Sequence, residues 1–106
     1  MEKNYAETAA NWWCEKILEK IKEGNFGYSP KNIDKFRDSL SSEINRIFSL
    51  DAHLSITTYN SSSKLLNSIA TLTGMNATIP KGYEMTIFPI SGVLVYNEVG
   101  RLVASF

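Results

Sequence analysis

The spacing of hydrophobic residues changes after residue 50, and this change constrains the fold more than any other feature of the sequence. Over residues 30–49 apolar side chains recur at steps of three and four, which predicts an amphipathic helix. Over residues 53–59 apolar and polar side chains alternate, which predicts a strand with one buried face. The chain must therefore combine helices with a sheet.

The other elements follow from the same two spacings and from the turn residues between them. They are a helix over residues 5–23, a helix over 62–73, a strand over 84–90 and a hairpin with arms at 93–96 and 102–104. Gly24 and Gly74 end two of the helices, and Pro89 favours an edge position or a bulge for the strand that contains it. The order ααβαβββ predicts an α+β fold with a small antiparallel or mixed sheet and helices on one face.

The length of 106 residues predicts a single domain over residues 1–106, with one modest core. Apolar side chains near the end of the chain exceed what such a core can hold. These side chains are Phe88, Ile90, Leu94 and Tyr96. A homodimer that covers the far face of the sheet would account for them.

The charge balance limits the classes of partner. Eleven basic side chains balance eleven acidic ones, without the basic excess or basic stripe of a nucleic-acid binder, so we expect no binding to DNA. No segment approaches the roughly 20 apolar residues that span a membrane, and residues 1–4 lack the start of a signal peptide, so we expect a cytoplasmic protein. A small, mostly neutral ligand or a protein surface is the favoured partner.

Two side chains invite a catalytic interpretation, and neither has the partners that catalysis needs. His53 lies near Asp51, at a junction where an aspartate commonly bonds to backbone. Cys14 falls on the apolar face of the first predicted helix, where a cysteine is structural and inert. We therefore expect no enzyme. One cysteine and one histidine cannot supply a structural zinc site, and we expect no metal and no cofactor.

Trp12 is the most informative residue for binding. The apolar face of the first predicted helix centres near Ala10 and Ile17, and Trp12 lies about 160° from that centre at 100° per residue. An outward-facing tryptophan favours a binding surface. Packing of the ring under a neighbouring loop or against the C-terminal hairpin is an equally good interpretation.

Two polar loops could hold a phosphate group. The turn over residues 60–64 has three serines and a lysine at the start of a helix, where backbone N–H groups attract anions, although capping by serine is the favoured interpretation. Residues 80–83 offer a lysine for a phosphate and a tyrosine for a base, although a solvated turn is favoured there. The candidate ligand-binding residues are Trp12, Tyr59, Ser61, Ser62, Ser63, Lys64, Lys81 and Tyr83.

Three short motifs follow one another along the chain. They are Asn11-Trp12-Trp13, then Tyr-x-x-Ser-x-x-Leu at Tyr59, Ser62 and Leu65, and then Pro-x-x-x-x-Met-x-Ile at Pro80, Met85 and Ile87. In their order and approximate spacing the chain resembles small accessory proteins of phages and prophages of Gram-positive bacteria. The chain differs from these proteins after Pro80, where they tend to have an aromatic residue.

The resemblance implies an anti-defence protein that acts in the cytoplasm of a host bacterium. Small proteins of this kind either sequester a nucleotide immune signal or bind a defence protein directly, as anti-CRISPR proteins do. The neutral charge, the serine turn and the Lys81 loop favour a non-catalytic sponge for a nucleotide, with the loops of a homodimer paired across a two-fold axis. Binding to a defence complex is the alternative, and a structural or assembly role in the virion is a third.

Overall fold

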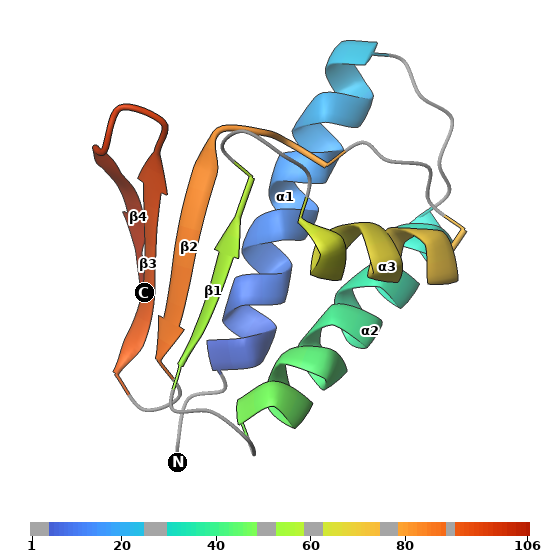
Figure 1. Ribbon diagram of the computed structural model, residues 1–106. Coiled ribbons are helices and arrows are strands. Elements are labelled where there is room, and N and C mark those ends of the chain that lie inside the picture. The colour runs from blue at the N-terminus through green and yellow to red at the C-terminus, as the bar shows by residue number, and fades with distance from the viewer. Residues whose placement is uncertain (1–4, 25–29, 49–52, 59–62, 75–78, 89–90) are drawn as a thin grey trace.

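A computed structural model describes residues 5–24, 30–48, 53–58, 63–74, 79–88 and 91–106, and in these ranges the chain forms three helices and one four-stranded sheet (Figure 1). The elements are α1 (Tyr5–Gly24), α2 (Pro30–Phe48), β1 (Leu54–Thr57), α3 (Lys64–Leu72), β2 (Tyr83–Phe88), β3 (Gly92–Asn97) and β4 (Leu102–Ser105). The predicted α+β class and the order ααβαβββ are confirmed. The strands β1 and β2 are shorter than predicted, and residues 59 and 89–90 of the predicted strands lie outside the described ranges.

The sheet is antiparallel throughout, with its strands in chain order β1-β2-β3-β4. Helix α3 lies between β1 and β2 in sequence, yet these two strands are direct neighbours in the sheet. The edge position that Pro89 suggested for β2 is wrong, because β2 pairs with β1 on one side and β3 on the other. The described strand ends at Phe88, and Pro89, with the bulge that was the alternative to an edge position, lies outside the described ranges.

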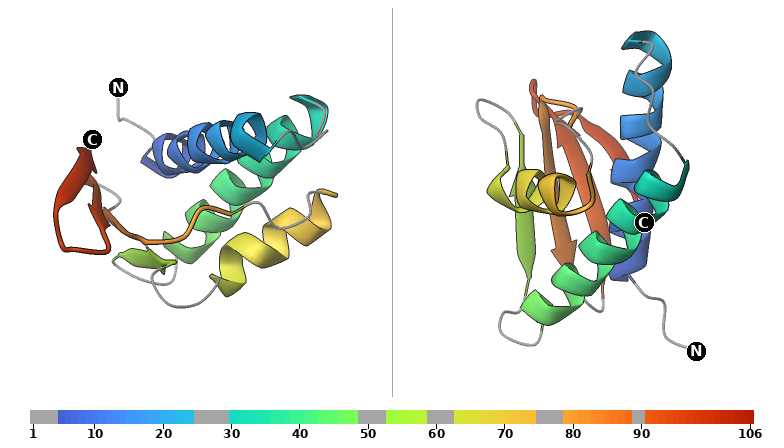
Figure 2. Two further views of the ribbon diagram at one scale, coloured as in Figure 1. Left: turned by 90° about the horizontal axis from the view of Figure 1, so that it is seen from above. Right: turned by 90° about the vertical axis from the view of Figure 1, so that its right-hand side faces the viewer.

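Helix α1 packs on α2 with one side and on the sheet with another (Figures 1 and 2). Toward α2, the Cys14 Sγ lies 3.9 Å from the carbonyl oxygen of Ile33. Toward the sheet, the Trp12 ring meets the ring of Tyr83 on β2. At 100° per residue the buried arc of α1 from Trp12 to Cys14 spans about 200°, roughly twice the width of a one-sided apolar stripe.

The two faces of the sheet differ in burial because side chains alternate along each strand. The inner face packs against the helices and is almost fully buried; it includes Ile56, Met85, Ile87, Val93 and Val95. The positions between them face outward, where Phe88 is exposed and Leu94 and Tyr96 are half-buried. The apolar surplus predicted from the sequence therefore lies on the outer face at these three positions, and Ile90 lies outside the described ranges.

Both ends of α3 are fixed by side chains. At the start, the Ser63 Oγ accepts a hydrogen bond of 3.2 Å from the Leu66 N–H. At the end, Thr73 is the cap, its Oγ1 donates to the Ile69 carbonyl at 2.8 Å, and Gly74 follows with φ +77°. The Asn32 Nδ2 on α2 donates to the Thr73 carbonyl at 3.1 Å, which ties α3 to α2.

The hairpin β3–β4 closes through Asn97, and its far end depends on Gly92. The Asn97 Oδ1 accepts hydrogen bonds from the N–H groups of Val99, at 3.1 Å, and Arg101, at 3.0 Å. Gly92 has φ +133°, and a Cβ atom on it would fall on the backbone carbonyl oxygen of Phe106. That carbonyl accepts the Val93 N–H at 3.0 Å, so a side chain at position 92 would open the β3–β4 ladder.

We expect Gly92→Ala to lower the free energy of unfolding by more than about 2 kcal/mol, because it adds a backbone clash to the cost of a positive φ. Gly100→Ala is the matched control: Gly100 has φ +81°, no atom lies within 4 Å of its added Cβ, and the loss should stay near about 1 kcal/mol. Urea unfolding of the two variants measures the difference. Equal losses would contradict the clash.

Candidate functional site

Trp12 is buried, with 6% of its surface exposed, so of the two equal interpretations the outward-facing one is wrong and packing is correct, although the ring packs on Tyr83 of β2. The helical repeat gives its direction correctly, but that direction leads to the sheet. Its ring makes edge-to-face contacts with Trp13, at 4.9 Å between centroids, and with Tyr83, at 5.1 Å. These are favourable geometries for aromatic packing, and they make Trp12 part of the core.

Lys16 covers the outer side of this aromatic cluster. Its Nζ lies 5.5 Å from the centroid of the Trp12 ring and 6.0 Å from that of Tyr83, within the range of a cation–π contact. The same Nζ lies 3.4 Å from a Glu19 carboxylate oxygen. The long side chain of Lys16 thus lies against the aromatic rings and keeps its charge close to them.

The structure places the second of the two polar loops beside the end of β1. The Gly82 N–H donates to the Thr58 carbonyl at 2.7 Å, and the Thr58 N–H donates to the Tyr83 carbonyl at 2.7 Å. The Tyr83 N–H also donates to the Thr58 Oγ1 at 3.2 Å. Residues 81–83 thus lie beside the end of β1, where the chain enters the serine turn. Tyr59, Ser61 and Ser62 of the predicted site lie outside the described ranges.

The described members of that predicted site have different surroundings. Ser63 uses its hydroxyl to cap α3, which confirms the capping interpretation. Lys64 and Lys81 are exposed, and Tyr83 is half-buried with its ring against Trp12. The two lysines are therefore the described side chains of the predicted site that a ligand can reach most easily.

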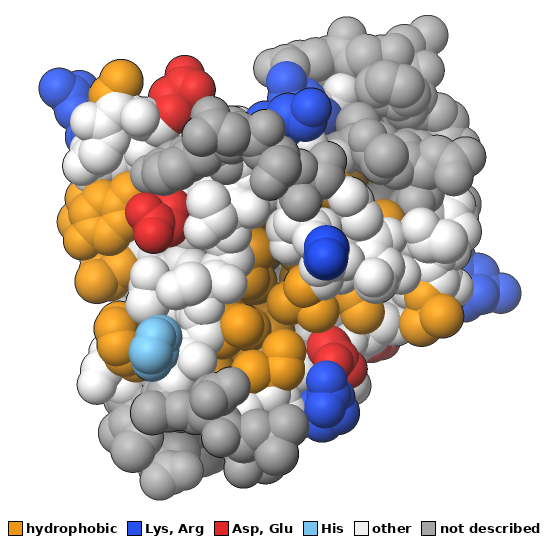
Figure 3. All heavy atoms as spheres, in the orientation of Figure 1, with side chains coloured by type: hydrophobic (Ala, Val, Ile, Leu, Met, Phe, Trp, Pro, Cys, Tyr) orange, Lys and Arg blue, Asp and Glu red, His pale blue; other side chains and the backbone are white. Residues whose placement is uncertain are grey.

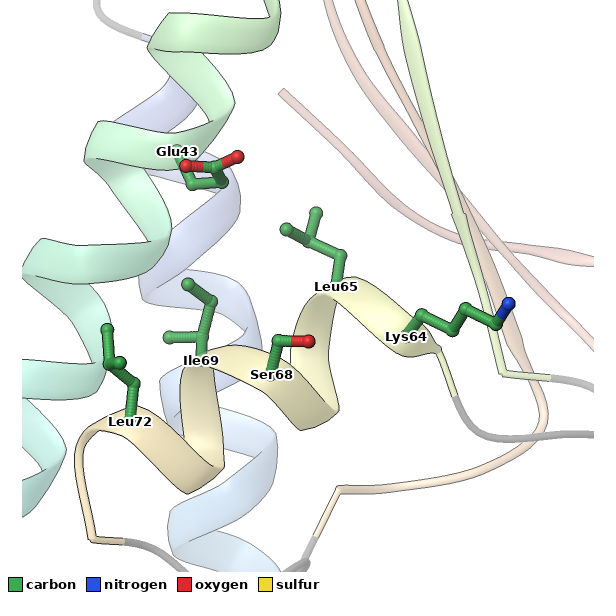
Figure 4. Close-up of a pocket in the computed structure, with 6 residues that line it drawn as sticks. All are labelled: Glu43, Lys64, Leu65, Ser68, Ile69 and Leu72. Carbon is green, nitrogen blue, oxygen red and sulfur yellow. The ribbon is translucent and has the colours of Figure 1, made fainter.

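A groove between α2 and α3 is the clearest hollow in the described part of the chain, and sequence reasoning missed it. Leu65, Ile69 and Leu72 project from α3 toward α2 at i, i+4 and i+7 (Figure 4). Glu43 lies opposite on α2, and Lys64 and Ser68 complete this part. The groove continues along α2 past Asp38, Ser39, Ser42 and Arg46. We call this set of residues the α2–α3 groove.

The floor of the α2–α3 groove is apolar and its charges balance. Ile69 is buried at the floor, whereas Leu72 is 78% exposed at the open end. The Arg46 Nε donates to a Glu43 carboxylate oxygen at 2.9 Å, and this hydrogen bond lowers the pKa of Glu43. The groove also contains Asp38 and Lys64, so it has two acidic and two basic side chains in total. Such a surface suits apolar side chains better than a phosphate.

The residues with possible catalytic chemistry lie apart from this groove. Burial raises the pKa of the Cys14 thiol to about 11, so the thiol is protonated at neutral pH. His53 is exposed, and its ring stacks on Phe88 at 6.0 Å between centroids. Among the described residues, no three His, Cys, Asp or Glu side chains are grouped to hold a metal ion, and no helix is long and apolar enough to cross a membrane.

We expect Trp12→Ala to lower the free energy of unfolding by about 3–5 kcal/mol, because it removes a buried indole from the contact between α1 and the sheet. Trp12→Phe keeps a ring against Tyr83 and should lose clearly less. Urea unfolding gives both values, and iodide should quench the fluorescence of the folded protein only weakly. A Trp12→Ala protein as stable as the parent would contradict the packing role.

The raised pKa of Cys14 predicts slow alkylation of the folded protein. At pH 8 a thiol with a pKa of about 11 has about 100-fold less thiolate than one at 9.0, so iodoacetamide should react at least that much more slowly than with the urea-unfolded chain. The rate should rise as the pH approaches 11. Mass spectrometry of timed samples measures it, and equal rates for folded and unfolded protein would show an accessible, ordinary thiol.

The sequence matches no protein-family model, and comparisons with curated proteins and with solved structures find no match. The function proposed below therefore depends on the groove, on the two lysines and on the resemblance in short motifs.

Proposed function

We propose that this chain is a non-catalytic protein of phage type that inhibits bacterial immunity by binding a protein of a defence complex through the α2–α3 groove. One observation carries the proposal: Leu72, 78% exposed, stands at the open end of an apolar groove whose floor is Ile69. A single exposed leucine is common on protein surfaces, but Leu72 continues the apolar groove of Leu65 and Ile69, and an apolar surface with a polar rim is typical of a site that a partner covers. We infer that the partner presents a short amphipathic segment, whose apolar side chains enter the groove.

The charges of the groove favour a protein segment over a nucleotide. Phosphate groups need cations or free N–H groups close by, but the Arg46 guanidinium is already bound to Glu43, and Asp38 adds a second carboxylate. An amphipathic segment can bury its apolar side chains on Leu65, Ile69 and Leu72 and leave its polar side chains at the charged rim, whereas a nucleotide would lose the hydration of its phosphates. Binding to a protein therefore becomes the first proposal, ahead of the sequestration favoured by sequence alone.

The phage setting is supported by the resemblance in short motifs. Trp12 and Trp13 of the first motif are core residues, as is Met85 of the third, so these parts of the resemblance concern packing. A protein that keeps this core can still vary the exposed side chains of α2 and α3. We accordingly propose action in the cytoplasm of a host bacterium, without transfer of binding residues from other proteins.

Sequestration of a nucleotide immune signal is the second candidate, and one observation favours it. The hydrogen bonds between Thr58 and residues 82–83 place Lys81 at the end of the sheet from which the chain enters α3, whose first residue is Lys64. The two exposed lysines could then act together on one phosphate-containing ligand.

We expect Leu72→Asp to abolish protection of phage in a plating assay on bacteria that carry the targeted defence system, because a carboxylate would enter the apolar contact. The matched control is Lys81→Ala, on a residue outside the groove, which should protect phage like the parent. Both changes are on exposed residues and should alter the free energy of unfolding by less than about 0.5 kcal/mol.

The opposite pattern would support sequestration: the lysine variant fails while Leu72→Asp protects. In that case cyclic di- or trinucleotides or ADP-ribose derivatives should raise the melting temperature, since a ligand at 100 times its Kd adds about 2.7 kcal/mol. If neither variant changes the plating of phage, the groove is not the site. Copurification with phage particles, with no effect on defence, would instead favour a role in the virion.

A further inference from the structure

The two edges of the sheet differ in the side chains that they expose. Both edge strands have four residues, and at the β1 edge the exposed side chains Ser55 and Thr57 are polar. At the other edge, β4 exposes Leu102 and Val103, and no described element lies beyond it (Figures 1 and 2). Hydrophobic side chains gather along the margin formed by the β3–β4 hairpin (Figure 3). Such an edge can pair with another strand.

The backbone groups of β4 that point away from β3 can be identified from the ladder. Val93 and Phe106 exchange two hydrogen bonds, of 3.0 and 2.9 Å, and Val95 lies opposite Ala104. Because bonded and non-bonded pairs alternate in an antiparallel ladder, both backbone groups of Ser105 point outward. The carbonyl of Val103 points outward as well, since it shares a peptide unit with the inward N–H of Ala104. The free edge thus offers one donor and two acceptors.

We propose that β4 pairs with β4 of a second copy of this chain, antiparallel and centred on Ala104, so that the two sheets continue into one. In this register the Ser105 N–H of each copy donates to the Val103 carbonyl of the other, and the two-fold axis makes both bonds equivalent. The side chain at the axis is the small one of Ala104. Leu102 of each copy lies opposite Phe106 of the second copy.

The charges of the edge agree with a two-fold contact. A two-fold axis brings each segment against itself, so a charged residue near the axis would meet its own copy and repel it. Residues 102–106 carry no charged side chain and no proline, two of the devices by which edge strands avoid pairing. A third device, a bulge, is present opposite Val95 and Tyr96, and Ser105 and Phe106 lie in the regular part of the ladder beyond it. The nearest charge along the strand is that of Arg101, at its start, and the antiparallel arrangement separates the two copies of that residue.

The exposed area indicates a reversible dimer. Exposed fractions of 47%, 45% and 43% for Leu102, Val103 and Phe106 leave roughly 200 Å² of apolar surface on each copy. If about 57% of an interface is apolar, the pair buries about 700 Å² in total, below the roughly 1,200–2,000 Å² of a stable dimer, so the contact is a weak one. We therefore expect single chains in dilute solution and dimers in concentrated solution. The proposal is independent of the α2–α3 groove, which lies on other elements.

Sedimentation velocity of the full chain over a wide range of concentrations tests the proposal. The apparent mass should rise toward twice that of one chain as concentration increases. In parallel, the Ser105 amide proton should exchange rapidly with solvent in dilute protein and more slowly, by at least tenfold, in concentrated protein. The Phe106 amide, which bonds to Val93 in every copy, serves as the internal reference and should be protected throughout.

Two variants locate the contact on β4. Ser105→Pro removes the outward donor, and Val103→Lys places two charges near the axis without altering the β3–β4 ladder; each should restore the mass of one chain at all concentrations. Ser55→Lys, on the opposite edge, should dimerise like the parent, and so should Leu72→Asp. Single chains in the parent at the highest concentration would overturn the proposal, as would a Val103→Lys protein that is folded by circular dichroism and still dimerises.

Discussion

The burial of α1 on two sides is the constraint on which the rest of this structure depends. A chain of 106 residues can build only one modest core. Because α1 contacts both α2 and the sheet, its side chains bury apolar surface of both neighbours. Three fully buried alanines, Ala6, Ala9 and Ala10, allow close approach along its first half. Farther along the helix, the rings of Trp12 and Trp13 pack against the ring of Tyr83 on β2. The helix thus presents small buried side chains first and large ones after them.

The elements themselves could be read from the sequence, because each has a clear hydrophobic period or a marked turn. The surroundings of a single side chain are harder to predict from the sequence. The helical repeat places Trp12 some 160° from the centre of the apolar face at 100° per residue, which is correct, but it leaves solvent and packing equally open. A helical wheel describes one helix, and it cannot say that a sheet will cover the second side.

The α2–α3 groove could not be predicted for a related reason. Leu65, Ile69 and Leu72 form an ordinary apolar stripe in sequence, and nothing in that stripe reveals that α2 covers its middle and leaves its end open. The bond from Asn32 to the Thr73 carbonyl, which joins residues 41 positions apart, sets this offset. By contrast, the composition of the serine turn is visible in the sequence, and its described member Ser63 caps the start of α3. Local motifs are visible in a sequence, whereas a hollow between elements is not.

The place of α3 in the sheet topology has a consequence for how such a protein can diversify. Strands β1 and β2 are neighbours, and the bonds of Thr58 with Gly82 and Tyr83 close the pair at the end from which α3 departs. The residues between β1 and β2 therefore do not interrupt the pairing of these two strands. The exposed side chains of α3 can change without altering that pairing, whereas Leu66, Ile69 and Ala70 belong to the core. A connection of this kind lets exposed residues vary on a fixed framework, as the loops of an antibody domain do.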